Sequence, residues 1–171
     1  MDIQNSMQTK DEKHFYYMGL ALQEAEKAMG QDEVPVGAIL VRDDEILAKG
    51  YNQTECKKSP FAHAEILVLE EASKKLKGWR LLGTTLYVTL EPCSMCAGAL
   101  VLARVQSIVF SLKDSKSGAC GSVFNIVQNA KINHRIEITE GIRSEESLAL
   151  LQNFFRMKRQ KNKIKKQVND L

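Results

Sequence analysis

Two short motifs hold the residues best suited to chemistry. His63 and Glu65 lie two positions apart in the stretch AHAEIL, and Cys93 and Cys96 lie three positions apart in PCSMC. Side chains three positions apart share one face of a helix, so the two thiolates can bind a single ion. A helix N-terminus stabilises thiolates further, because its free N–H groups favour negative charge. With His63 as a third ligand the set becomes His/Cys/Cys, which suits zinc.

Glu65 helps to decide between a catalytic and a structural metal site. On a helix it points ~200° of rotation away from His63, so a place beside the metal, facing a bound water, fits it better than joint chelation. Three protein ligands and one open position are typical of catalytic zinc, whereas structural sites usually have four ligands. Zinc would lower the pKa of the water from 15.7 toward roughly 7. Glu65 could then accept its proton and deliver it to a substrate.

The CxxC motif alone is also compatible with sites of a different kind. It could be a redox pair or part of a zinc ribbon, and Cys56 or Cys120 could complete a structural Cys₃His site. The combination of H-x-E with a later P-C-x-x-C, each at an expected helix start, favours the catalytic interpretation.

The elements that must position these motifs alternate between helix and strand. Apolar residues at helical spacing predict helices over 11–29 and from Ile66 to Leu76, the latter with Gly78 as C-cap. Further helices are expected from Pro92 to about Arg104 and from Ser144, as N-cap, into the C-terminal tail. Apolar and β-branched runs predict strands at 36–41, from 46 onward (joined to the first by a turn at 42–45), and at 85–90, 107–112 and 135–139. This order predicts an α/β sandwich around one mixed sheet, with the binding site beyond the C-terminal ends of its strands.

Composition places the chain among ordinary soluble globular proteins. Its 171 residues, 44% apolar and 26% charged, predict one domain with a substantial core. The polar opening segment predicts no signal peptide, and the longest uncharged apolar stretch, the 12 residues Pro92 to Ala103, is too short to span a membrane. We therefore expect a cytoplasmic protein whose four cysteines are thiols or metal ligands rather than disulfides.

The two motifs resemble the signature of zinc-dependent cytidine and adenosine deaminases, a known sequence pattern of base-deaminating enzymes. The resemblance to bacterial tRNA-specific adenosine deaminases extends from about Lys13 to Gln160, through EVPVGAILV, LYVTLEPCSMCAGAL, KDSKSG, NHRIEITEGI and NFFRMKRQ. It implies a three-layer α/β/α sandwich of the cytidine deaminase type, with a central mixed five-stranded sheet, and a homodimer.

The same resemblance implies an activity and its catalytic residues. It implies hydrolytic deamination of adenosine to inosine at the wobble position of a tRNA anticodon, that of an arginine tRNA. One zinc ion would be bound by His63, Cys93 and Cys96, with Glu65 as proton shuttle.

Contacts to the substrate are also implied. Asn52 and the backbone near Ala62 would contact the flipped base. In the KDSKSG loop, Lys116 is a candidate for a phosphate contact, and Asp114 could bond a ribose or order its own loop.

The C-terminal tail differs in charge from the rest of the chain. Residues 1–155 hold 17 basic and 20 acidic residues, a balance of −3, whereas 156–171 hold seven basic and one acidic, a balance of +6. Such asymmetry suggests a polyanionic partner, although a solvated terminus would also explain it. Phe154, Phe155 and Arg159 combine stacking surfaces with charge, which suits the single-stranded loop of a tRNA anticodon, yet either ring could instead pack in the core.

Two rival functions remain at this point. One is a deaminase of a free nucleobase, nucleoside or nucleotide, which would not need a strongly basic tail. The other is a non-catalytic, zinc-stabilised RNA-binding module, which would need a fourth protein ligand.

Overall fold

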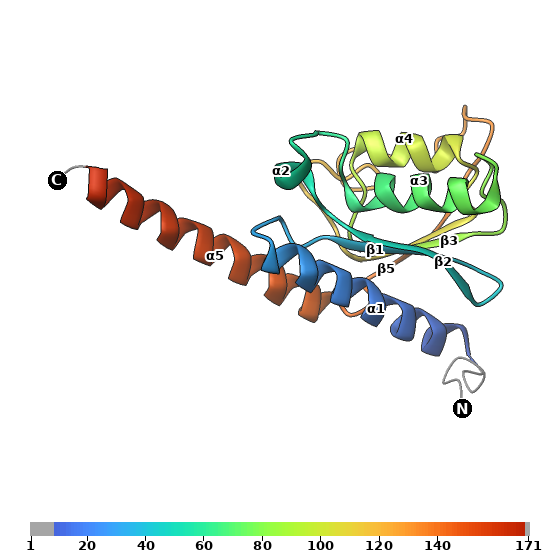
Figure 1. The fold of residues 1–171 in the computed structure, drawn as a ribbon. Helices are drawn as coiled ribbons and strands as arrows, with labels where there is room; N and C mark the ends of the chain where they lie inside the picture. The colour runs from blue at the N-terminus through green and yellow to red at the C-terminus, as the bar shows by residue number, and fades with distance from the viewer. Residues whose placement is uncertain (1–8, 170–171) are drawn as a thin grey trace.

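Five strands form one sheet that lies between two layers of helices (Figure 1). The structure is a computed structural model and describes residues 9–169; the polar opening segment 1–8 and residues 170–171 of the tail lie outside the described residues. The strands are β1 (Gly37–Arg42), β2 (Glu45–Tyr51), β3 (Thr85–Leu90), β4 (Ser107–Leu112) and β5 (Glu137–Glu140). The helices are α1 (Lys10–Gly30), α2 (Thr54–Lys57), α3 (Ala64–Leu76), α4 (Ser94–Leu102) and α5 (Ser144–Asn169).

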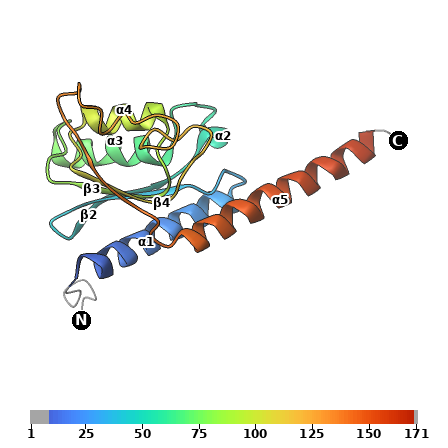
Figure 2. The same ribbon diagram turned by 180° about the vertical axis from the view of Figure 1, so that it is seen from behind.

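The sheet is mixed, with strand order β2-β1-β3-β4-β5. β1 is antiparallel to both of its neighbours, while β3, β4 and β5 are parallel to one another. Helices α3 and α4 cover one face, and α1 and the first part of α5 cover the other, as two opposite views show (Figures 1 and 2). The predicted three-layer α/β/α sandwich with a mixed five-stranded sheet is therefore confirmed.

Successive side chains of the strands pack alternately into two hydrophobic cores, one on each face of the sheet. In β1, Leu40 belongs to the cluster that includes residues of α3 and α4, whereas Ile39 belongs to the cluster on the α1 side. In β4, Phe110 and Val109 divide in the same way. Because successive strand residues point to opposite faces, apolar runs without polar interruption are what a doubly covered sheet requires.

The direction of the strands determines where a site can form. β2 and β3 are both antiparallel to β1, and β4 is parallel to β3, so β2, β3 and β4 run the same way. Their C-terminal ends lie at one edge of the sheet. The segment leading to α3, the segment leading to α4 and the loop after β4 all begin at this edge. This edge is where ligands bind in sheets of this kind.

The boundaries of α4 differ from the predicted ones. The helix begins at Ser94 rather than near Pro92, because the Pro92 carbonyl accepts a hydrogen bond from the Ala119 N–H at 2.8 Å and is tied to the loop after β4. It ends at Leu102 because Arg104 adopts a left-handed backbone conformation with φ of 61°.

Smaller corrections apply at three other places. Lys77, and not Gly78, occupies the left-handed C-cap of α3, and Gly78 follows it and donates its N–H to an earlier helix carbonyl. β5 begins two residues later than expected, because the Ile136 N–H bonds to the Val127 carbonyl outside the sheet. Ser144 is the first residue of α5 rather than a flanking cap.

The last helix extends well beyond the sheet (Figures 1 and 2). Its distal part is exposed and carries the basic residues of the tail. No helix in the described part of the chain is both long and apolar enough to cross a membrane.

Candidate active site

Three soft ligands converge at the C-terminal edge of the sheet. His63 flanks the start of α3, Cys93 flanks the start of α4, and Cys96 lies in the first turn of α4. The His63 Nδ1 atom is 3.7 Å from Cys93 Sγ and 3.5 Å from Cys96 Sγ. Among the residues that the structure describes, these three form the group whose ligand atoms, all within 4.8 Å of one another, could hold a metal ion.

The three side chains of this group shift one another's pKa values. The hydrogen bond from Cys96 lowers the pKa of the Cys93 thiol to about 4, while that same pairing with Cys93 raises the pKa of Cys96. The hydrogen bond with Cys93 raises the pKa of His63. The Cys93 thiolate is thus stabilised by its neighbours, and its negative charge makes ionisation of Cys96 less favourable. A divalent cation would offset the repulsion between two thiolates, and one imidazole with two thiolates is a donor set that fits zinc.

Neither remaining cysteine joins this group. Cys56 is exposed on α2, and Cys120 is buried. Burial raises the pKa of the Cys120 thiol to about 12, which keeps it protonated and a poor metal ligand. Of the described residues, none supplies the fourth ligand that a closed structural site requires.

Glu65 lies beside the ligands in a small enclosed cavity. Its side chain is buried, and burial raises the pKa of its carboxyl group. The cavity has a volume of about 90 Å³, well below the volumes of pockets for drug-sized molecules. Its lining includes Asn52, His63, Glu65, Glu91, Cys93 and Asp114. A space of this size suits one planar base rather than a whole nucleotide.

Asn52 is held at the cavity wall by a buried glutamate that the sequence analysis missed. The Asn52 Nδ2 atom donates to Glu33 Oε2 at 3.2 Å and to Thr54 Oγ1 at 3.3 Å. Glu33, which is fully buried, also accepts the backbone N–H groups of Glu55 at 3.2 Å and Cys56 at 2.7 Å, at the start of α2. The Glu33 side chain therefore both caps a short helix and fixes the Asn52 amide. Its partners lie 19 to 23 residues away, so the sequence around Glu33 does not reveal this role.

The comparisons with known proteins agree with this geometry. A family model described as MafB19-like deaminase matches residues 12–159. The tRNA-specific adenosine deaminase of Bacillus subtilis (strain 168) is 48% identical over 155 residues, which make up 91% of this chain and 94% of that protein. The tRNA-specific adenosine deaminase of Haemophilus influenzae is 45% identical over 157 residues, or 91% of this chain and 89% of that protein. The chain belongs to the bacterial tRNA-specific adenosine deaminases of the cytidine deaminase superfamily.

Solved structures give the same assignment. One from a study of A-to-I editing by tRNA:A34 deaminases at the wobble position is 40% identical, with a TM-score of 0.77 over 80% of this chain and 99% of that one. A more distant structure, in complex with 2,6-diaminopurine, is 26% identical, with a TM-score of 0.69 over 82% of this chain and 80% of that one. The resemblance inferred from the motifs is confirmed.

In this deaminase Ala62 and Asp114, two of the predicted substrate contacts, differ in whether they line the cavity. The Ala62 side chain is buried, its N–H donates to the Ser59 carbonyl at 3.2 Å, and its carbonyl accepts from the Gln53 N–H at 2.9 Å. Ala62 is thus a fixed part of the segment before His63 and does not itself line the cavity. Asp114 does line the cavity.

The carboxylate of Asp114 orders its own loop, which is one of the two roles expected for it. It accepts the N–H groups of Lys116 at 2.9 Å and Ser117 at 3.3 Å, and the Ser117 hydroxyl. Burial, the largest single influence, opposes ionisation of the Asp114 carboxyl, yet these bonds together hold its pKa below the usual value.

A basic groove adjoins the cavity. It runs between the loop after β4 and α5, has a volume of about 1200 Å³ and shares Leu90 with the cavity. Lys116, Phe155 and Arg159, three of the predicted substrate contacts, all line it, together with Lys113 and Arg156. Phe155 is 45% exposed there. The structure therefore brings one aromatic ring and several cations together beside the catalytic cavity.

Phe154 is buried and is therefore not available as a stacking surface. Its side chain is 3% exposed, because α5 lies with this position toward the body of the protein. Adjacent positions on a helix point about 100° apart, so Phe155 points in a different direction. The Lys158 amine lies 5.4 Å from the centre of the Phe154 ring and pairs with Asp32 at 2.9 Å, while Lys161 pairs with the same carboxylate at 3.1 Å. Phe154 therefore anchors the extended helix, and Phe155 faces the groove.

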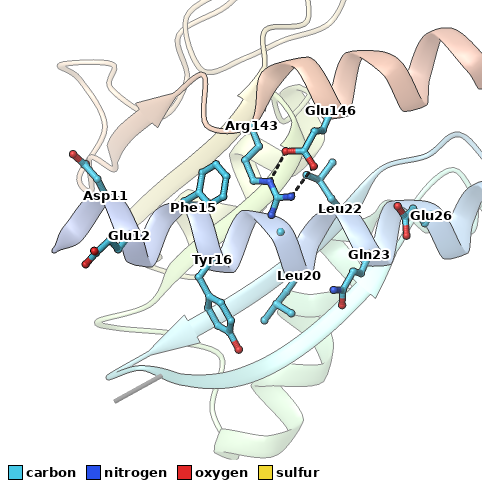
Figure 3. A pocket seen from close by; sticks show the side chains of 11 residues that line it. Asp11, Glu12, Phe15, Tyr16, Leu20, Leu22, Gln23, Glu26, Arg143 and Glu146 are labelled. Carbon is cyan, nitrogen blue, oxygen red and sulfur yellow. Dashed lines mark hydrogen bonds and ion pairs between the residues drawn. The ribbon is translucent and has the colours of Figure 1, made fainter. Parts of the chain in front are cut away.

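A second groove lies on the face of the sheet that α1 covers, between α1 and the start of α5 (Figure 3). The Arg143 guanidinium stacks over Phe15 at 4.7 Å and forms two hydrogen bonds of 2.6 Å with Glu146 (Figure 3). Asp11 and Glu26 add further negative charge. This groove contains none of the residues of the metal group, and its charge is opposite to that needed for a polyanion.

Proposed function

We propose that this enzyme hydrolyses adenosine to inosine at the wobble position of a tRNA anticodon, that of an arginine tRNA, with one zinc ion per chain. The observation that carries the proposal is the position of buried Glu65, which shares a ring-sized cavity with two residues of a His/Cys/Cys group. This arrangement is the one that hydrolytic deamination of a base requires.

The chain's own residues would divide the work as follows. His63, Cys93 and Cys96 would hold zinc, which supplies the Lewis acidity that makes a water nucleophilic near neutral pH. Glu65 takes the proton released by the attacking water and transfers it to the adenine ring nitrogen. It then takes the remaining proton of the added hydroxyl group and transfers it to the amino group, which leaves as ammonia. Water and adenosine are consumed, and inosine and ammonia are formed. Asn52, which lies in the cavity wall, holds the base in place.

The basic groove supports an RNA substrate over a free nucleoside. A single base fits the cavity, whereas the neighbouring nucleotides need a larger, positively charged surface with an aromatic platform. Lys116, Phe155 and Arg159 provide both features in the groove that shares Leu90 with the cavity. An anticodon loop presents its bases partly unstacked, so that extruding the target costs only a few kcal/mol.

We also propose that the enzyme is a homodimer. Large apolar side chains remain exposed at the end of α4 and in the loop after β4, where Leu102 is 72% and Phe124 56% exposed. A second copy would remove such surface from water. The mass in solution, measured by light scattering, tests this directly.

The decisive experiment compares substrates. Purified protein is incubated with arginine tRNA carrying adenosine at the wobble position, with the same tRNA carrying cytidine there, and with free adenosine, cytidine and guanine. Inosine in the first tRNA, without uridine in the second and without deamination of the free compounds, supports the proposal. Turnover of the free compounds alone would assign the enzyme to the small-molecule deaminases. Binding of tRNA with no turnover would leave a non-catalytic RNA-binding module.

A further inference from the structure

A second buried glutamate lines the catalytic cavity without serving the chemistry described above. Glu91 follows β3 and lies two positions before Cys93, in the metal-binding loop (residues 91–93) that leads into α4. Its side chain is 3% exposed and lies in the lining of the same cavity as Glu65. A buried carboxylate without partners is costly, so its hydrogen bonds indicate its function.

All the acceptor positions of Glu91 are used by one loop. Oε1 accepts the N–H groups of Cys120 at 2.9 Å and Ser122 at 3.1 Å. Oε2 accepts the N–H of Asp114 at 2.9 Å and the hydroxyl of Ser122. An ionised carboxylate offers about four acceptor sites, and four donors fill them. Every acceptor site of the Glu91 side chain is therefore occupied by a donor from this loop.

The loop that it binds, residues 113–122, leads from the cavity to the basic groove. Asp114 lines the cavity, and Lys116 lines the groove. The backbone of Glu91 adds a further tie, because its N–H donates to the Leu112 carbonyl at 2.8 Å, just before this loop. One residue therefore joins the end of β3, the end of β4 and the substrate-facing loop.

Gly118 provides independent evidence for close packing around the carboxylate. A Cβ atom at Gly118 would overlap the Glu91 carboxylate and lie 2.6 Å from the Asp114 carbonyl oxygen. Gly118 also pairs with Cys93 in an isolated β-bridge. Glycine is needed here for space, and the packing connects the loop directly to a residue of the metal group.

We propose that Glu91 is a positioning residue, which fixes the 113–122 loop against the metal-binding loop so that the cavity and the basic groove present one continuous surface to the RNA. The proposal rests on the proposed function for the identity of the substrate. It assigns Glu91 an effect on substrate binding, transmitted through the loop, rather than on the chemical step.

The test uses Glu91→Gln in the zinc-loaded enzyme, with Glu71→Gln, the same change at an exposed position of α3, as the matched control. A carboxamide has a single acceptor oxygen and turns an NH₂ group toward backbone donors. Amide hydrogen exchange, followed by mass spectrometry, should accelerate in peptides covering 113–122 but not in the control. KM for an anticodon stem-loop RNA should rise about tenfold, the effect of losing one or two buried hydrogen bonds, with kcat less affected and zinc content unchanged.

Ser122→Ala is the second variant, because it removes one hydrogen-bond donor from the Glu91 carboxylate and leaves the carboxylate in place. It should accelerate exchange in the same peptides, and it decides the matter alone if Glu91→Gln does not fold. Unchanged exchange in a folded variant, or a fall in kcat at constant KM, overturns the proposal. Exchange is measured without substrate, so its outcome stands whether or not the wild-type enzyme forms inosine in tRNA. Absence of wild-type turnover would contradict the proposed function instead.

Discussion

Two adjacent phenylalanines should respond oppositely to the same substitution. Phe154 is 3% exposed, and truncation of a buried phenylalanine to alanine typically costs about 3–5 kcal/mol. Phe154 belongs to neither of the two core clusters and is covered in part by the Lys158 side chain, so we expect about 3 kcal/mol, at the lower end of this range. For a protein of this size that loss lowers Tm by about 6 to 12 °C. Phe154→Ala should then bind RNA nearly as well as the wild type at temperatures where it remains folded.

Phe155→Ala should show the reverse pattern. The ring is 45% exposed in the basic groove, so stability should change by less than about 1 kcal/mol. Loss of a base-stacking surface should weaken binding of an anticodon stem-loop by about 1–3 kcal/mol, or roughly 5- to 150-fold in Kd. Thermal unfolding by circular dichroism and RNA titration by fluorescence anisotropy measure the two effects separately. If Phe154→Ala leaves Tm unchanged and reduces RNA affinity more than Phe155→Ala, the assigned orientation of α5 is wrong.

Three further predictions concern the metal, the proton carrier and the tail. Glu65→Ala should retain fold and zinc but lose turnover, and retained inosine formation would remove Glu65 from the mechanism. Cys120→Ser should retain zinc by elemental analysis whereas Cys96→Ser should lose it, because Cys120 lies outside the ligand group; zinc loss in both variants would indicate a four-ligand site. Truncation after Phe155 removes seven basic residues and should flatten the salt dependence of RNA binding, by about 0.7 in the slope of log K against log[salt] for each phosphate that the tail neutralises. An unchanged slope in a truncated protein of normal helicity would identify the tail as a solvated terminus.

The residues that the sequence revealed are those whose chemistry is rare and whose positions follow from strand order. His63 and the two cysteines of PCSMC are uncommon at helix starts, and the parallel direction of β2 and β3 brings those starts to one edge. Strands β3 and β4 were predicted to the residue because both of their faces are covered, which leaves uninterrupted apolar runs.

What the sequence could not reveal depends on contacts between distant segments. Glu33 opens the EVPVGAILV segment and Glu91 directly precedes PCSMC, but the partners that give them their roles are 19 to 31 positions away. The choice between Phe154 and Phe155 depends on how α5 lies on the body, which involves Asp32 in the segment after α1. Helical spacing shows that the Phe154 and Phe155 rings point in different directions, but it does not show which of them faces the core.

The two buried glutamates explain how irregular segments can build a rigid site. Segments at the ends of strands lack partners in the sheet, and their backbone N–H groups still need acceptors when they are buried. Glu33 supplies acceptors to the segment that carries Asn52, and Glu91 supplies them to the loop that carries Asp114. The cavity is thus fixed on two sides by carboxylates that take no part in proton transfer, while Glu65 remains the carboxylate that faces the metal group. Holding the walls in advance spares the substrate the entropic cost of ordering them, so that its binding energy can be used to extrude and orient the base.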